Sequence, residues 1–124
     1  MLRIVAICLA IATSASADDP GGPFGPAKVS KADIALAQGT VRAALLDPAS
    51  ANFGPVGAGQ NPRGRVVICG LVNGKNAFGG YTGDQYFYGA LSADRSTFFV
   101  NGIGGNSGFL CGAIGLRLQR APML

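Results

Sequence analysis

Apolar side chains recur every three or four positions after residue 30, which is the spacing of one face of a helix. The members of this stripe are Ile34, Ala37, Val41 and Leu45. Ser30 precedes the stripe and Asp33 follows it by three residues, an arrangement typical of a capping box with Asp in place of Glu. Asp47-Pro48 ends the pattern, because the residue before proline avoids helical backbone angles. The spacing therefore predicts one helix of about four turns.

Beyond the helix the pattern changes to short apolar runs, rich in β-branched and aromatic residues and bounded by glycine, asparagine and proline. These runs predict a short edge strand in a loop-rich region and four further strands, at Asn52–Val56, Arg65–Val72, Gln85–Leu91, Ser96–Val100 and Phe109–Ile114. Asn73-Gly74 is a turn dipeptide, and Ser92–Arg95 is a four-residue connection that makes a hairpin. The pattern predicts an α+β fold, with one N-terminal helix packed on a small antiparallel β-sheet.

Residues 1–17, MLRIVAICLAIATSASA, have the pattern of a secretory signal peptide. Arg3 supplies the positive start, and Ala15-Ser16-Ala17 fits a cleavage site. The apolar stretch between them is shorter than the roughly 20 residues of a membrane-spanning helix, so a membrane anchor is the less favoured alternative. Residues 18–28 are rich in proline and glycine and are expected to form a flexible linker, which leaves residues 29–124 as a single domain. We therefore expect an exported protein of the periplasm or the extracellular space.

The chain has three cysteines, and export would leave only two of them in the mature protein. Cys8 lies inside the predicted signal peptide and leaves with it, so Cys69 and Cys111 remain. An oxidising compartment favours a disulfide between these two, and two separate buried thiols are the alternative. We expect the disulfide to staple the sheet, joining the strand that contains Cys69 to a last strand that contains Cys111.

Charge and composition narrow the chemistry that this chain can perform. Its net charge of +4 comes from scattered basic residues, which is not the clustered pattern of a nucleic-acid-binding protein. The chain has no His, and all six acidic residues are Asp, so Ser–His, Cys–His and His–metal sites are excluded. Asp84 and Asp94 remain as the candidate carboxylate pair of a small hydrolase or lytic factor. The glycine-rich segments lack the spacing of phosphate-binding loops, and we expect no cofactor.

One glycine-rich segment concentrates asparagine, lysine and aromatic residues. It reads ICGLVNGKNAFGGYTG at residues 68–83, and the predicted helix end reads LLDPASANF at residues 45–53. Together they resemble a family of small exported bacterial proteins that share the patterns L-x-D-P-x-S-A-x-F and V-C-G-x-V-N-x-K-N-x-F-G-G-Y-x-G. Ile68 stands where the family more often has Val. The resemblance implies one exported α+β domain, and it implies no catalytic residue, ligand or cofactor.

The same segment supplies the candidate binding residues, which are polar groups flanked by aromatic rings that can pack against a ligand or partner. They are Asn73, Lys75, Asn76, Phe78, Tyr81, Tyr86 and Tyr88. In the alternative interpretation Asn73-Gly74 makes a turn, Lys75 is solvated and the aromatic side chains cap the sheet. We predict a non-enzymatic protein of the cell envelope that binds a protein or a cell-wall component. The hydrolase and a purely structural accessory domain are the alternatives, and the oligomeric state is left open.

Overall fold

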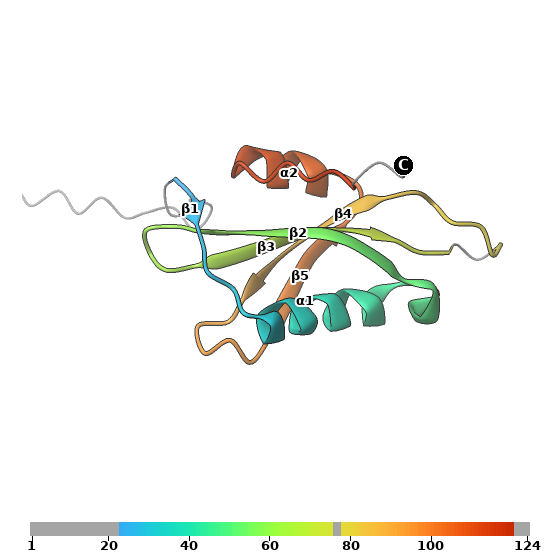
Figure 1. Ribbon diagram of the computed structural model, residues 1–124, viewed down its shortest axis with the longest axis horizontal. Coiled ribbons are helices and arrows are strands. Elements are labelled where there is room, and N and C mark those ends of the chain that lie inside the picture. The colour runs from blue at the N-terminus through green and yellow to red at the C-terminus, as the bar shows by residue number, and fades with distance from the viewer. Residues whose placement is uncertain (1–22, 76–77, 121–124) are drawn as a thin grey trace, which may run out of the picture.

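The protein is a five-stranded antiparallel sheet with one helix on each face (Figure 1). The computed structural model describes residues 23–75 and 78–120. The elements in chain order are β1 (Gly25–Pro26), α1 (Lys31–Ala44), the short 3-10 helix η1 (Pro48–Ser50), β2 (Asn52–Gln60), β3 (Val66–Asn73), β4 (Gln85–Leu91), β5 (Phe98–Ile103) and α2 (Ser107–Ala113). The strands form a meander in which each strand pairs with its sequence neighbours. The α+β class and the antiparallel sheet are confirmed.

The structure describes only part of the two segments predicted at the N-terminus, the signal peptide and the linker. The predicted signal peptide, residues 1–17, lies outside the described residues. The predicted linker, residues 18–28, contributes β1, which pairs Gly25 with Gln60 and Pro26 with Gly59 of β2. The described end of this segment is therefore part of the sheet.

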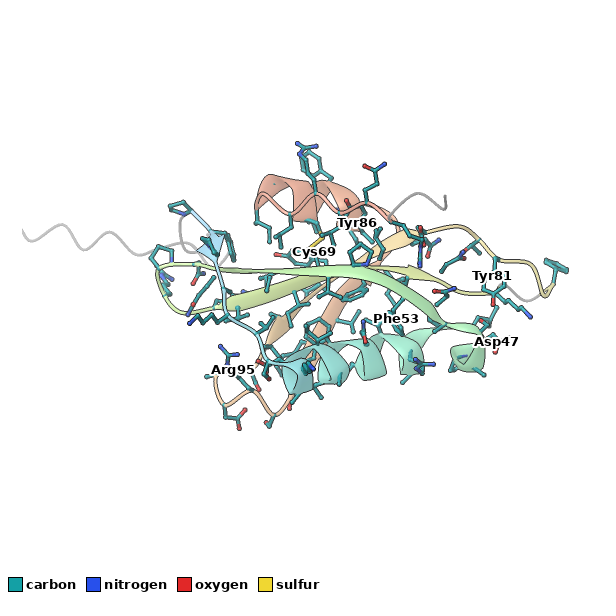
Figure 2. All side chains as sticks on the ribbon, in the orientation of Figure 1. Asp47, Phe53, Cys69, Tyr81, Tyr86 and Arg95 are labelled. Carbon is teal, nitrogen blue, oxygen red and sulfur yellow. A yellow bond between two sulfur atoms is a disulfide. The ribbon has the colours of Figure 1, made fainter. Side chains whose placement is uncertain are left out.

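The predicted helix is confirmed as α1. Ser30 accepts a hydrogen bond from the Asp33 amide at 3.1 Å, and the Ser30 amide donates to the Asp33 carboxylate at 2.9 Å. The hydrogen bond from the Ser30 backbone is the main reason that the pKa of Asp33 lies below its ordinary value. Arg95, in the β4–β5 turn, adds an ion pair to the same carboxylate (Figure 2). The cap thus fixes the start of α1 and also ties it to the far hairpin.

Strand β3 is buried along nearly its whole length, because both faces of the sheet are covered. One set of its side chains, which includes Ile68 and Val72, packs with Ala37 and Val41 of α1. The alternate set, which includes Val67 and Cys69, packs beneath α2. Strand β4 has the predicted bounds, Gln85–Leu91, while β5 begins two residues later than predicted and runs on to Ile103.

The prediction of a last strand at Phe109–Ile114 is wrong, because this segment lies mostly in helix α2. A run of six apolar and small residues fits a buried strand or a helical turn equally well. The burial of Ser107 and Cys111, four residues apart, is the helical spacing. The predicted Cys69–Cys111 disulfide is confirmed, with a Cα–Cα distance of 6.1 Å. It therefore pins α2 to the central strand instead of joining two strands.

Strand β2 is longer than the predicted edge strand at Asn52–Val56. It covers nine residues and lies between β1 and β3. Its glycines and Pro55 lower the strand signal in the sequence. Gly57 leaves the space that Leu116 fills, since a Cβ at position 57 would stand 3.0 Å from the Leu116 side chain. The chain after α2 therefore packs directly on β2.

Candidate functional site

The connection between β3 and β4 is a long loop at one end of the sheet. The tight turn predicted at Asn73-Gly74 is wrong, since β3 ends at Asn73 and β4 begins at Gln85. Within the loop, Lys75 and Tyr81 form an isolated antiparallel bridge. The loop projects beyond the sheet next to the C-terminal end of α1 (Figure 1).

Polar contacts hold the base of this loop. The Asn73 side chain accepts a hydrogen bond from the Gly83 amide at 3.1 Å, and the Thr82 amide donates to the Gly74 carbonyl at 3.2 Å. Gly83 has φ of +88°, a conformation that glycine adopts without strain. Asn73 is therefore a positioning residue at the base of the loop.

Two segments that are distant in the sequence, residues 45–53 and 68–83, meet at this base. The Ser50 hydroxyl donates to the Asp47 carbonyl at 2.7 Å and accepts from the Lys75 amide at 2.8 Å. Gly74 lies beside the same segment, since a Cβ at position 74 would stand in van der Waals contact with Leu45 at 3.5 Å and with Ser50 at 3.8 Å. The D-P-x-S segment after α1 thus braces the N-x-K segment of the loop. Sequence reasoning missed Ser50, although its position two residues after Pro48 is a turn signal.

An ion pair anchors the end of the loop that leads into β4. Arg120 donates to both carboxylate oxygens of Asp84, at 2.7–3.1 Å, and to the side-chain and backbone oxygens of Asn52 at 3.2 Å. The hydrogen bonds from Arg120 lower the pKa of Asp84. Asp84 is thus an ionised group that joins the C-terminal segment to the starts of β2 and β4.

The predicted pairing of Asp84 with Asp94 for hydrolysis is wrong. Asp84 precedes β4, and Asp94 follows it in the turn to β5. A seven-residue strand separates them, which spans roughly 20 Å or more and exceeds the 5–10 Å of a carboxylate pair. Asp94 instead accepts hydrogen bonds from Ser92 and Ser96, which lower its pKa to about 2. Asp84 thus anchors the C-terminal segment through Arg120, and Asp94 stabilises the turn between β4 and β5.

Large apolar side chains are exposed around the loop. Phe78 at the loop tip is 96% exposed, Tyr81 is 54% exposed, and Leu46 just after α1 is 72% exposed. The Lys75 ammonium lies 5.5 Å from the centre of the Tyr81 ring, within range of a cation–π interaction. Asn76, the remaining candidate of this loop, lies outside the described residues. The loop therefore presents aromatic surface to solvent, with the half-buried Lys75 beside it.

A cleft of about 270 Å³ lies between the loop and the end of α1. Its lining is mainly aliphatic, with a few polar groups: Ala44, Leu45, Leu46, Val72, Gly74, Lys75, Thr82, Gln85 and Ile103. This lining includes Leu46, which is exposed, and Lys75, which is half-buried. We call the cleft together with Leu46, Lys75, Phe78 and Tyr81 the loop-end surface.

Tyr86 and Tyr88, which were predicted to join the binding residues, lie elsewhere. They alternate with Phe87, which points into the core beneath α1, so they face α2 (Figure 2). The Tyr86 hydroxyl donates to the Leu118 carbonyl at 2.9 Å and accepts from the Leu118 amide at 2.7 Å. Tyr86 thus holds the C-terminal segment and Tyr88 packs against the cluster beneath α2, so neither is part of the loop-end surface.

Comparison with models of known protein families, with curated proteins and with solved structures finds no match to this chain. Over residues 23–75 and 78–120, no helix is long and apolar enough to cross a membrane.

Proposed function

We propose that this protein is an exported, non-enzymatic binding domain that recognises a protein partner through the loop-end surface. The observation that supports this most is that Phe78 and Tyr81 are exposed on the same loop whose Lys75 and Thr82 line an aliphatic cleft, with the exposed Leu46 in the cleft wall. Aromatic side chains are enriched in the cores of protein interfaces, where they bury a large area. Exposed apolar side chains that gather at one end of a soluble domain are typical of an interaction site.

The cleft favours a protein over a cell-wall polysaccharide as the ligand. Most of its lining, which includes Leu45, Val72 and Ile103, is aliphatic and offers no hydrogen bonds to sugar hydroxyls. Its polar side chains are few: Lys75, Thr82 and Gln85. An apolar side chain from a partner fits such a lining, and Lys75 at the rim favours an acidic neighbour beside it. The anchors at Asn73 and Ser50 hold the base of the loop before binding, which reduces the entropy that binding costs.

Export rests on residues 1–17 and is supported by the disulfide. Cys69 and Cys111 are both fully buried and bonded to each other. Structural disulfides are typical of proteins in oxidising compartments. If the protein is exported as proposed, the species in the periplasmic fraction begins at Asp18 and contains no free thiol. A full-length chain with reduced cysteines would contradict export.

Affinity capture from envelope extract tests the binding proposal. The bait is the exported protein, with Tyr81→Ala and Lys75→Ala as the test variants and Phe109→Ala as the matched control. Phe109 is 78% exposed on α2, so its truncation removes a similar apolar surface away from the loop. We expect a protein that is retained by wild type and by Phe109→Ala and is lost from both loop variants. Equal capture by all four baits would contradict the proposal, and retention on isolated cell wall alone would replace it with the polysaccharide alternative.

A further inference from the structure

The outer edge of β5 has neither the charged residues nor the prolines that hinder strand pairing at exposed sheet edges. The opposite edge is guarded, since β2 contains Pro55 and pairs with β1 at Gly59 and Gln60. Strand β5 contains no proline and no charge, and residues 96–116 have no charged side chain. Natural sheets block their edges with lysine, proline, bulges or a covering element. Within the described residues, no strand pairs with the outer edge of β5.

The backbone groups of Phe98 and Val100 point toward this edge. In the preceding turn the Ser92 amide donates to the Thr97 carbonyl at 2.9 Å, which makes these two residues a hydrogen-bonded pair. Pairs alternate along an antiparallel ladder, so Phe99 bonds inward to β4 while its two neighbours face outward. A bulge after Val100 breaks the alternation, so the regular outward-facing segment is Phe98–Val100.

A large apolar side chain lies at the centre of this short segment. Phe98 packs into the core beneath α1, so the alternation of the strand turns Phe99 to the opposite face. There Phe99 remains 57% exposed. The edge thus combines outward-facing backbone groups with an exposed aromatic ring at its midpoint.

We propose that β5 pairs with β5 of a second copy of this chain, antiparallel and about a two-fold axis at Phe99. In this register each Phe98 exchanges backbone hydrogen bonds with Val100 of the other copy, and the two Phe99 residues lie directly opposite each other. Facing aromatic pairs stabilise antiparallel strands. The bulge selects this register, because a shift along the strand would place the bulged segment in the ladder.

A second copy suits this edge better than an unrelated strand. A two-fold axis lets identical outward-facing groups satisfy one another, so one surface serves both partners. The strand itself carries no charge, although the chain carries +4. Arg63 and Arg65 line a pocket with Phe99 on its side toward β4, which also includes Ala90 and Leu91, away from the outer edge. Three paired residues bury far less than the ~1,600 Å² of a standard interface. The dimer is therefore weak and depends on protein concentration.

Sedimentation velocity over a range of protein concentrations tests the proposal. We expect wild type to shift from monomer to dimer with rising concentration, and Phe99→Lys to remain monomeric, with dimerisation weakened about tenfold or more. Phe109→Lys places the same charge on exposed α2 surface and should dimerise like wild type. Thermal unfolding of both variants verifies that the fold is intact. A wild type that stays monomeric at every concentration, or a Phe99→Lys variant that dimerises normally, would overturn the proposal.

A cysteine crosslink tests the register independently. Opposed Phe99 positions would have Cα atoms about 4.5 Å apart, within the range that a disulfide spans. Phe99→Cys should therefore give a covalent dimer on mild oxidation, and Phe109→Cys should not. Equal crosslinking of both variants, or none from Phe99→Cys, would overturn the two-fold arrangement.

Discussion

Gly70 is a position where one added methyl group should disturb the core strongly. Gly70 lies opposite Phe87 across β3 and β4, and a Cβ at position 70 would stand 2.3 Å from two atoms of the Phe87 ring. This ring is fully buried and makes edge-to-face contacts with Phe53 and Phe98, at centroid distances of 6.3 and 6.4 Å. It therefore cannot move aside without displacing its neighbours in the core beneath α1.

We expect Gly70→Ala to lower the free energy of unfolding by about 2–3 kcal/mol, the upper part of the range for overpacked cores. For a domain of this size the melting temperature falls by roughly 10–20 °C. The matched control is Gly39→Ala in α1, where an added Cβ meets nothing within 4 Å. Removing a glycine from a helix interior should raise stability by roughly 0.5–1 kcal/mol, so the two identical substitutions should have opposite signs.

Thermal unfolding followed by circular dichroism measures both effects. A double variant identifies the cause: with Phe87→Leu in place, Gly70→Ala should cost less than it does alone, because the smaller side chain leaves room for the methyl group. A Gly70→Ala melting temperature equal to that of wild type would refute the argument. Strictly additive effects of the two substitutions would refute the steric explanation.

Three further predictions concern the crosslink, the loop and acid stability. Replacing Cys111 by Ser should lower unfolding stability by up to about 4 kcal/mol by the loop-entropy model, and reductant should leave the urea midpoint of this variant unchanged while lowering that of wild type. Ser50→Ala removes the acceptor of the Lys75 amide, so hydrogen exchange at that amide should accelerate, and unchanged protection would contradict the bracing role. The pKa of Asp94 is lowered from 3.8 to about 2, chiefly by Ser92, so its contribution to stability is present above about pH 4 and is lost as the pH falls toward 2. The Asp94→Asn variant should lose less stability than wild type over that interval, and parallel pH profiles would contradict this.

The elements that the sequence predicted well are those with strong local signals. The Ser30–Asp33 cap located α1, and the alternation of Tyr86 and Tyr88 around Phe87 located β4. Strand β2 was only partly predicted because its glycines give little strand propensity, and one of them, Gly57, leaves the space that Leu116 fills. Helix α2 was misread as a strand because a short apolar run carries no decisive period.

The same limit applies to the candidate site: residues that are close in the sequence were predicted, and those that only the fold brings together were not. Lys75, Phe78 and Tyr81 are close in the sequence, so their motif brings them to one loop. Leu46 comes from the end of α1, and only the fold places it beside the cleft. Tyr86 and Tyr88 follow the loop in sequence, but strand alternation sends them toward α2. Reading the sequence therefore identified the loop residues but not Leu46, which the fold adds to the loop-end surface.

The central claim is that the loop-end surface contacts a protein partner, and photo-crosslinking from position 78 in exporting cells tests it most directly. A photoreactive phenylalanine analogue replaces Phe78 in one variant and Phe109 in another, since both side chains are largely exposed. We predict a protease-sensitive adduct of discrete mass from position 78 and none of that mass from position 109. No adduct from position 78, or the same adduct from both positions, would contradict the claim.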